Sequence, residues 1–337
     1  LDEGVPVGWL PPQPQVEIDT WNTITGFADK YNKPGEFTAL IGWEWSSIPG
    51  GANLHRVVVT SADAATAQQF QPFGLDDSPF PEDLWAWLET TSNETGADFI
   101  AIPHNSNISK GYMFDDKTLR GEAIDADYAA RRMKWEMIAE VTQIKGDSET
   151  HPDLSPDDPF AEFETYPFYI QRETTPYKAE QGDYIRPALR RGLALERSAG
   201  VNPYQFGLIG STDAHTAMAS AEEDNFHGKL ASDSIPANKS NQWGRNNGVT
   251  GWDMSASGLA AVWAQDNTRE AILAAMKRRE VYATTGPRIG VQFYGGWGLG
   301  EADLGAENLY AQATAAGVPM GGELRPSGQG VTSPGFI

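Results

Sequence analysis

The stretch Phe206-Gly207-Leu208-Ile209-Gly210-Ser211-Thr212-Asp213-Ala214-His215 joins a short apolar run to side chains of the kind that bind metal ions. The same order recurs twice, because Glu44 follows the apolar run 37–43 and His104 follows the largely apolar run 98–102. Short apolar runs bounded by turn residues are typical of strands buried on both faces. The three runs therefore predict three buried strands, each with a candidate metal ligand beyond its C-terminal end.

The rest of the pattern predicts helices between the strands. We expect helices at 19–31, 81–90, 124–133, 183–199 and 269–279, and further strands at 54–60, 135–141, 281–285 and 289–294. This alternation predicts a parallel α/β sheet or barrel. Loops are expected at 147–176 and 220–257, and the second is long enough to frame a substrate. We expect one large domain over residues 1–297 and the start of a β-rich C-terminal appendage over 298–337.

The composition excludes several classes of partner. The 337 residues carry a formal net charge of −21, so no basic surface is expected for nucleic acid or for an anionic membrane. No apolar run approaches the roughly 20 residues that a membrane-spanning helix needs. Because the chain has no cysteine, a metal ion would have to be held by imidazole and carboxylate groups.

The ends of the chain bear on its localisation. It opens at Leu1 rather than Met and stops at Ile337 within a stretch rich in Gly, Ser and Pro. We therefore expect that a signal peptide has been lost upstream of Leu1. The absence of cysteine suits an oxidising compartment. A periplasmic or secreted location is favoured over a cytoplasmic one, and homo-oligomer formation is left open.

Each candidate ligand has a structural alternative. A lone histidine such as His104 is more often a hydrogen-bonded structural residue. Glu44 lies between Trp43 and Trp45, where burial of a carboxylate is unfavourable unless a cation pairs with it. In α/β barrels the C-terminal ends of the strands form the active-site face. Convergence of ligand-type residues at that face therefore favours a metal site over three separate structural roles.

Two further positions complete the candidate ligand set. Asp213 and His215 are alternate residues on a predicted extended loop, from which they can address neighbouring metal ions. His55 is the exception to the rule of strand ends, because it lies near the start of the predicted strand 54–60.

Four motifs resemble those of the polymerase-and-histidinol-phosphatase (PHP) superfamily: Gly42-Trp43-Glu44-Trp45-Ser46-Ser47, Asn53-Leu54-His55-Arg56, Ile102-Pro103-His104-Asn105 and Gly210-Ser211-Thr212-Asp213-Ala214-His215-Thr216. Within that superfamily, residues 136–149, Glu222-Glu223-Asp224-Asn225-Phe226 and Tyr282-Ala283-Thr284-Thr285-Gly286-Pro287-Arg288 resemble a bacterial family of unknown function, DUF3604. The resemblance covers nearly the whole chain.

The resemblance implies a fold and a cofactor. Members of the superfamily are distorted (β/α)7 TIM-like barrels that hold two or three divalent ions, usually zinc, manganese or iron. By motif match, Glu44 corresponds to a ligand that bridges two ions, His55 and His104 to ligands of one of them, and Asp213 and His215 to ligands on the last strand. Glu44, Asp213 and His215 are the expected catalytic residues. A His-x-His pair and a Thr-Asp-His motif are also implied, do not occur in these residues and are expected upstream of Leu1.

The expected activity is hydrolysis of a small, anionic phosphoester by metal-activated water. Hydrolysis of another ester or amide, such as a sulfate ester, and a non-catalytic metal-binding barrel are the alternatives. Five residues near the ligand motifs are candidates for substrate binding: Arg56, Asn105, Lys110, Lys145 and Glu140. Arg56 and Lys110 could equally be solvated surface charges. Glu140 could be a general acid, a partner of a ligand or a plain surface carboxylate.

Overall fold

The computed structural model describes residues 13–170, 175–216, 218, 227–242, 248–254, 258–300, 305, 308–327 and 333–337. Its first half contains α1 (Pro14–Tyr31), β1 (Ile41–Trp45), β2 (Arg56–Thr60), α2 (Ala64–Ala67), α3 (Pro81–Thr95), β3 (Phe99–Pro103), α4 (Ala126–Trp135), β4 (Ile138–Gln143) and β5 (Gly146–Asp147). Its second half contains α5 (Ile185–Ala199), β6 (Gly207–Gly210), β7 (Leu259–Val262), α6 (Arg269–Lys277), β8 (Val281–Thr284), β9 (Tyr294–Gly296), α7 (Leu309–Ala316), β10 (Val318–Pro319) and β11 (Gly335–Phe336).

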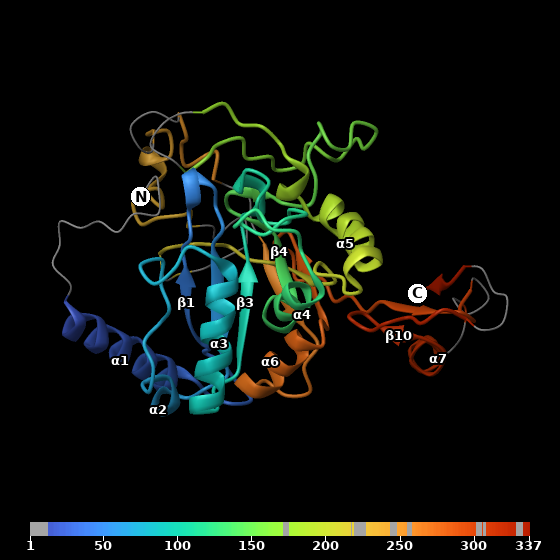
Figure 1. Ribbon diagram of the computed structural model, residues 1–337, viewed down its shortest axis with the longest axis horizontal. Helices are drawn as coiled ribbons and strands as arrows, with labels where there is room; N and C mark the ends of the chain where they lie inside the picture. The colour runs from blue at the N-terminus through green and yellow to red at the C-terminus, as the bar shows by residue number, and fades with distance from the viewer. Residues whose placement is uncertain are drawn as a thin grey trace.

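The helices begin and end where local chemistry favours it. The Thr268 side chain accepts a hydrogen bond from the Ala271 amide and so caps the start of α6. Pro81 opens α3, where its missing N–H leaves no helix hydrogen bond unmade, and Gly96 ends that helix in the left-handed conformation with φ of 75°. Helix α3 packs on the face of β3 that carries Phe99 and Ala101, whereas Leu273 of α6 packs on the opposite face, with Ile100 and Ile102 (Figure 1).

The strands of the described residues form four small sheets. In the first, β2 lies between β1 and β3 and runs antiparallel to both, with Glu44 opposite Val57 and Arg56 opposite Pro103. In the second, β4 pairs antiparallel with β5 and parallel with β6. The other two sheets are the antiparallel pair of β7 and β8 and the order β10-β9-β11. Strand β3 lies beside β4 and β6 lies beside β8.

The predicted (β/α)7 TIM-like barrel is wrong. No sheet among the described residues closes into a barrel, and β2, β5 and β7 each pair antiparallel with a neighbour. A barrel of that type needs parallel strands joined by crossover helices. Between β1 and β2 the chain has only the short 3₁₀ helix η1 (Pro49–Gly51), and a parallel crossover needs a dozen residues or more. Apolar runs predict burial but not strand direction.

Several predicted boundaries also shift. Of the run 37–43 only residues 41–43 are in a strand, β1, and of the expected strand 289–294 only Tyr294 is in a strand, β9. The loop expected at 220–257 lies partly outside the described residues. Its described parts are 227–242, which contains the 3₁₀ helix η5 (Pro236–Asn238), and 248–254.

The largest core cluster lies between the first sheet and α3. Trp45 of β1, Leu84 and Trp85 of α3, and Phe99 of β3 are each fully buried there. Leu84 and Leu88 lie one turn apart on the same face of α3, which is why this helix packs on the sheet. The ligand-bearing strands are therefore anchored on a rigid base.

A buried ion network joins β2 to α3 and α4. The Glu136 carboxylate accepts hydrogen bonds from Arg56 Nε at 2.9 Å and from Trp85 Nε1 at 2.8 Å. Arg132 NH2 lies 3.1 Å from the other carboxylate oxygen. Arg56, Arg132 and Glu136 are all at least 97% buried, so the two guanidinium groups depend on this one carboxylate for compensation.

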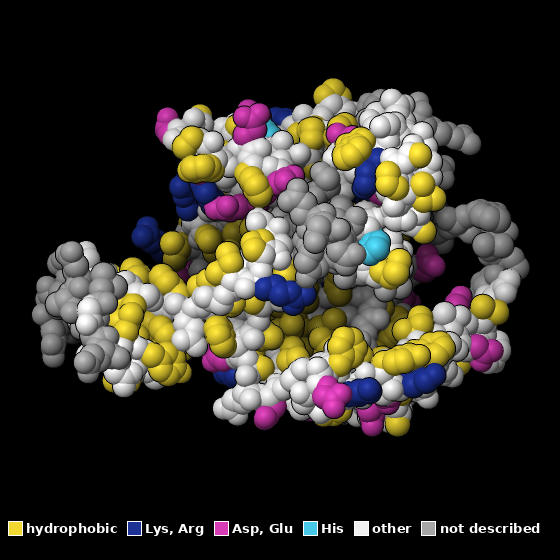
Figure 2. Space-filling view, turned by 180° about the vertical axis from the view of Figure 1, so that it is seen from behind, with side chains coloured by type: hydrophobic (Ala, Val, Ile, Leu, Met, Phe, Trp, Pro, Cys, Tyr) yellow, Lys and Arg dark blue, Asp and Glu magenta, His cyan; other side chains and the backbone are white. Residues whose placement is uncertain are grey.

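The C-terminal appendage is the sheet β10-β9-β11 with α7. Figure 2 shows hydrophobic side chains on it and in the hollow beside it. A cavity of about 760 Å³ lies at this junction, lined by Leu208 of β6, by Phe206 just before that strand, and by Phe293, Val318 and Phe336 from the appendage. Within the described ranges, none of the helices combines the length and the apolarity that crossing a membrane requires.

Candidate functional site

Three neighbouring strands bring Glu44, His55 and His104 to one edge of the first sheet. Glu44 lies near the end of β1, His55 directly precedes β2, and His104 directly follows β3. Because β2 runs antiparallel to its neighbours, its start lies beside their ends, with Trp45 opposite Arg56. The antiparallel direction of β2 thus explains how His55, at the start of its strand, joins ligands at strand ends.

The alternation of side chains along β1 separates the tryptophans from Glu44. Trp45 is fully buried in the core and Trp43 packs against that core, whereas the Glu44 side chain points to the other face and is 37% exposed. The carboxylate between two tryptophans therefore does not lie in apolar surroundings.

The three side chains form a compact group, which we call the Glu44 triad (Glu44, His55 and His104). Glu44 Oε1 lies 2.8 Å from His55 Nδ1 and 3.0 Å from His104 Nε2. One ligand atom from each residue lies within 4.8 Å of the other two. His55 Nε2 is buried and has no hydrogen-bond partner in the described structure. Two imidazole nitrogens and a carboxylate oxygen are a donor set that zinc, manganese and iron accept, so the triad fits a divalent ion.

The pKa values of the triad reflect burial and mutual contact. Burial raises the pKa of Glu44, but hydrogen bonds from His104 and His55 outweigh it and hold the pKa of this carboxyl well below its usual range. Burial lowers the pKa of His55, which favours the neutral ring that binds metals. Burial also lowers the pKa of His104, but the carboxylates of Glu44 and Glu140 outweigh it and raise that pKa above the usual value.

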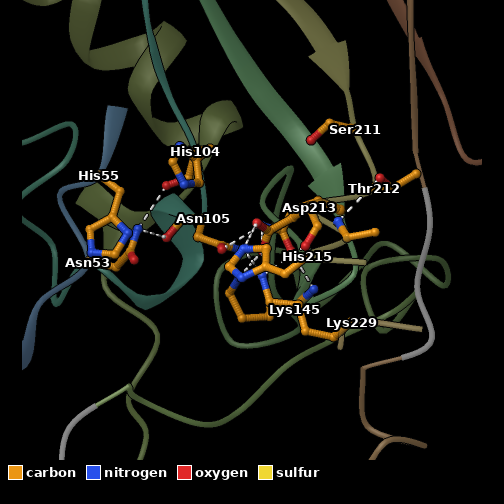
Figure 3. A network of polar contacts seen from close by, with 12 residues as sticks. Asn53, His55, His104, Asn105, Lys145, Ser211, Thr212, Asp213, His215 and Lys229 are labelled. Atoms are coloured by element: carbon orange, nitrogen blue, oxygen red, sulfur yellow. Dashed lines mark hydrogen bonds and ion pairs between the residues drawn. The ribbon is translucent and has the colours of Figure 1, made fainter. Parts of the chain in front are cut away.

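Asp213 and His215 belong to a second group, which we call the lysine pocket (Lys145, Asp213, His215 and Lys229; Figure 3). Parallel pairing of β4 with β6 places Lys145, just after β4, beside Asp213, just after β6. Asp213 Oδ2 accepts hydrogen bonds from Lys145 Nζ and Lys229 Nζ, and Asp213 Oδ1 lies 3.2 Å from His215 Nε2. Asp213 has a left-handed backbone with φ of 50°, uncommon for a residue with a side chain.

Burial and like charge act together in the lysine pocket. Burial raises the pKa of Asp213, but the contact with His215 and the charges of Lys145 and Lys229 hold it well below its usual range. Burial and the neighbouring Lys145 lower the pKa of Lys229 to about 8. The pocket thus contains two ammonium groups around one carboxylate.

Asn105 and Gln143 connect the two groups. Gln143 Nε2 donates to Asn105 Oδ1 at 2.5 Å and to Asp213 Oδ2 at 2.9 Å. Asn105 follows His104 directly and has φ of 50°, which turns the chain toward β4. Its Nδ2 is buried without a partner among the described residues, so it remains available to a ligand. The triad and the lysine pocket therefore face one connected polar site.

A family model described as "Protein of unknown function (DUF3604)" matches residues 9–337. The chain belongs to the DUF3604 family. No curated protein and no solved structure matches it. The function of this DUF3604 protein is therefore inferred from the geometry of its site.

The structure places the other expected substrate-binding residues of this DUF3604 protein in three ways. Lys145 and Asn105 lie in the connected polar site. Glu140 is buried behind Asp213 and accepts a hydrogen bond from Ser211 Oγ, and burial raises the pKa of its carboxyl. Arg56 belongs to the buried ion network rather than to the site, and Lys110 Nζ donates to the Gly50 carbonyl at 2.6 Å.

Two residues of the site were not found by sequence reasoning. Lys229 lies in a segment with no helical or strand periodicity, so no pattern marked it. Gln143 is the last residue of β4, and its place two residues before Lys145 is the signal that could have found it. Both are visible only when β4, β6 and the segment 227–242 lie together.

Proposed function

We propose that this DUF3604 protein is a metal-dependent hydrolase of small anionic esters, with phosphoesters as the first substrate class. The observation that carries the proposal is the convergence of two imidazoles and a carboxylate beside a pocket that holds two ammonium groups. A metal-binding triad alone would fit a structural ion equally well. The adjoining positive charge is what favours an anionic substrate.

The divalent ion would be held by Glu44, His55 and His104. When bound, such an ion lowers the pKa of a bound water and polarises an ester oxygen. Glu44 Oε1 lies beside both rings and holds them next to each other. A His104 tautomer protonated at Nδ1, which lies 3.5 Å from the Ile102 carbonyl, would leave Nε2 for the ion in place of its contact with Glu44.

The lysine pocket and Asn105 bind and orient the substrate in this proposal. Lys145 supplies positive charge to the anionic group, and the unpartnered Nδ2 of Asn105 donates to an ester oxygen. Gln143 holds the Asn105 amide in one orientation by donating to its oxygen. Asn105, Lys145 and Asp213 lie just after the ends of β3, β4 and β6, which suits a preorganised site.

The motifs that resemble the PHP superfamily support the same chemistry. All four motifs surround the connected polar site, although the fold is not a closed barrel. Membership of that superfamily is therefore part of the proposal.

The test is a comparison of Glu44→Gln with Glu36→Gln, a matched change at an exposed glutamate. Purified protein is loaded with Mn²⁺ or Zn²⁺, and its metal content is measured by mass spectrometry. Turnover is measured with nitrophenyl phosphate monoesters and diesters, nitrophenyl sulfate and a nitroanilide. We expect phosphoester turnover in the wild type and in Glu36→Gln, and loss of both bound metal and turnover in Glu44→Gln. Sulfate or amide turnover in place of phosphoester turnover would change the substrate class, and full metal content with unchanged turnover in Glu44→Gln would refute the proposal.

A further inference from the structure

The ammonium of Lys229 lies where the sequence motifs predict a metal ion bound by Asp213 and His215. Its Nζ is 2.5 Å from Asp213 Oδ2, 2.8 Å from the Asp213 carbonyl oxygen and 2.8 Å from His215 Nε2. A lysine ammonium has three N–H donors and no acceptor. These three contacts therefore use all of its donors.

The acceptors around Lys229 form the kind of set that would bind a cation. They comprise a carboxylate oxygen, a carbonyl oxygen and an imidazole nitrogen. Because lysine only donates, His215 Nε2 must accept in its contact with Lys229. That nitrogen then has no proton to donate to Asp213, so its longer contact with Asp213 Oδ1, at 3.2 Å, is not a hydrogen bond. Lys145 Nζ and Gln143 Nε2 donate to the same carboxylate, which leaves its Oδ2 fully engaged.

Local structure holds Lys229 in this position. The His215 amide donates to the Lys229 carbonyl at 2.7 Å, which ties the two backbones together. The buried carboxylate of Asp233 accepts from the Lys229 amide at 3.1 Å and the Leu230 amide at 2.7 Å. Gly228 precedes with φ of 87°, and a Cβ there would lie about 3.1 Å from the Asp233 carboxylate. Only 7% of the Lys229 surface is exposed, so this residue is an integral part of the pocket.

We infer that Lys229 supplies a built-in positive charge at Asp213 and His215, so that this protein combines one metal ion at the Glu44 triad with a lysine charge in place of a second ion. The inference rests on the proposed function and deepens it. Since Lys229 has no donor left, Lys145 is the lysine that binds the substrate. Within the described ranges, the acceptor found for its ammonium is Asp213. Its remaining donors suit the anionic group of an ester such as a phosphate monoester.

Metal stoichiometry separates this inference from a cluster of two or three ions. The measurement is the number of Mn²⁺ or Zn²⁺ ions per chain after equilibrium dialysis, with folding checked by circular dichroism. The variants are Asp213→Asn, Lys229→Met and their combination. Lys239→Met is the matched control, because Lys239 lies in the same segment and its ammonium is 5.7 Å from the Trp252 ring.

We expect one ion per chain in the wild type, in Asp213→Asn and in Lys239→Met. Lys229→Met, which frees Asp213 and His215, should bind one more ion, and adding Asp213→Asn should remove it again. Loss of an ion in Asp213→Asn, two or more ions in the wild type, or no gain in Lys229→Met would each overturn the inference. If Asp213→Asn does not fold, the count in Lys229→Met decides. In all of these cases, loss of the ion in Glu44→Gln would still support the proposed metal centre at the Glu44 triad. A wild type that binds no ion would refute both the proposed function and this inference.

Discussion

Replacing Glu136 with glutamine should destabilise the protein far more than the loss of a surface charge. The change keeps the size of the side chain but leaves the guanidinium groups of Arg56 and Arg132 without a buried counter-charge. The Glu136 side chain is 0% exposed, and those of Arg56 and Arg132 are 1% and 3% exposed, so water cannot compensate. Breaking a buried ion pair in this way costs about 3–5 kcal/mol. If the 337 residues unfold as one unit, the Tm should fall by roughly 4–7 °C.

The assay is urea unfolding followed by tryptophan fluorescence and circular dichroism. Trp85 donates to Glu136, so its emission reports directly on the network. The matched control is Glu89→Gln, which breaks the half-exposed pair with Lys134 and should change the unfolding free energy by less than about 0.5 kcal/mol. Metal content should stay at the wild-type level, because the network lies outside the Glu44 triad. A loss below about 1 kcal/mol in Glu136→Gln would show that the two arginines find other compensation, and the reasoning would fail.

Two further changes test the packing and the buried acids. Gly182→Ala would place a Cβ 1.8 Å from the Gly111 carbonyl oxygen, so the unfolding free energy measured in urea should fall by at least about 2 kcal/mol. The control is Gly26→Ala, which has open space around it in α1 and should raise the unfolding free energy by about 0.5–1 kcal/mol. Equal effects of the two changes would contradict the packing. Burial raises the pKa of Asp183 to about 7, so the stability contributed by its protonated form is lost as the pH rises through 7. The Tm of the wild type should therefore fall from pH 5 to pH 8 more steeply than the Tm of Asp183→Asn. Parallel curves from differential scanning fluorimetry would argue against a role of this carboxyl.

The sequence predicts where most strands lie but not how they pair. The apolar runs near Glu44, His104 and Asp213 overlap strands β1, β3 and β6 in the structure, and β3, which is buried along its whole length, has the continuous apolar signature of burial on both faces. Direction leaves no such signature. The antiparallel course of β2 depends on long-range pairing with β1 and β3, and that pairing is what replaces the expected barrel with separate sheets.

In the candidate site, too, the sequence predicts some residues, and the others depend on how distant segments pack together. The motifs around Glu44, His55 and His104 mark residues that the structure brings together, since each motif lies at a strand end or start. The motif around Asp213 and His215 marks residues that the structure places beside a lysine instead. Lys229 could not be predicted, because its position depends on the capping of one irregular turn by Asp233.

The antiparallel pairing of β1 and β2 also has a consequence for the order of folding. Glu44 and His55 are 11 residues apart and joined by a short connection, whereas His104, on the next strand of the same sheet, is 60 residues from Glu44. The contact between β1 and β2 can form early, because closing a short loop loses little chain entropy. A growing chain that has emerged as far as β3 and α4 already carries all three ligands, whereas the lysine pocket must wait for the segment that bears Lys229. The proposed metal site can therefore assemble before the lysine pocket is complete.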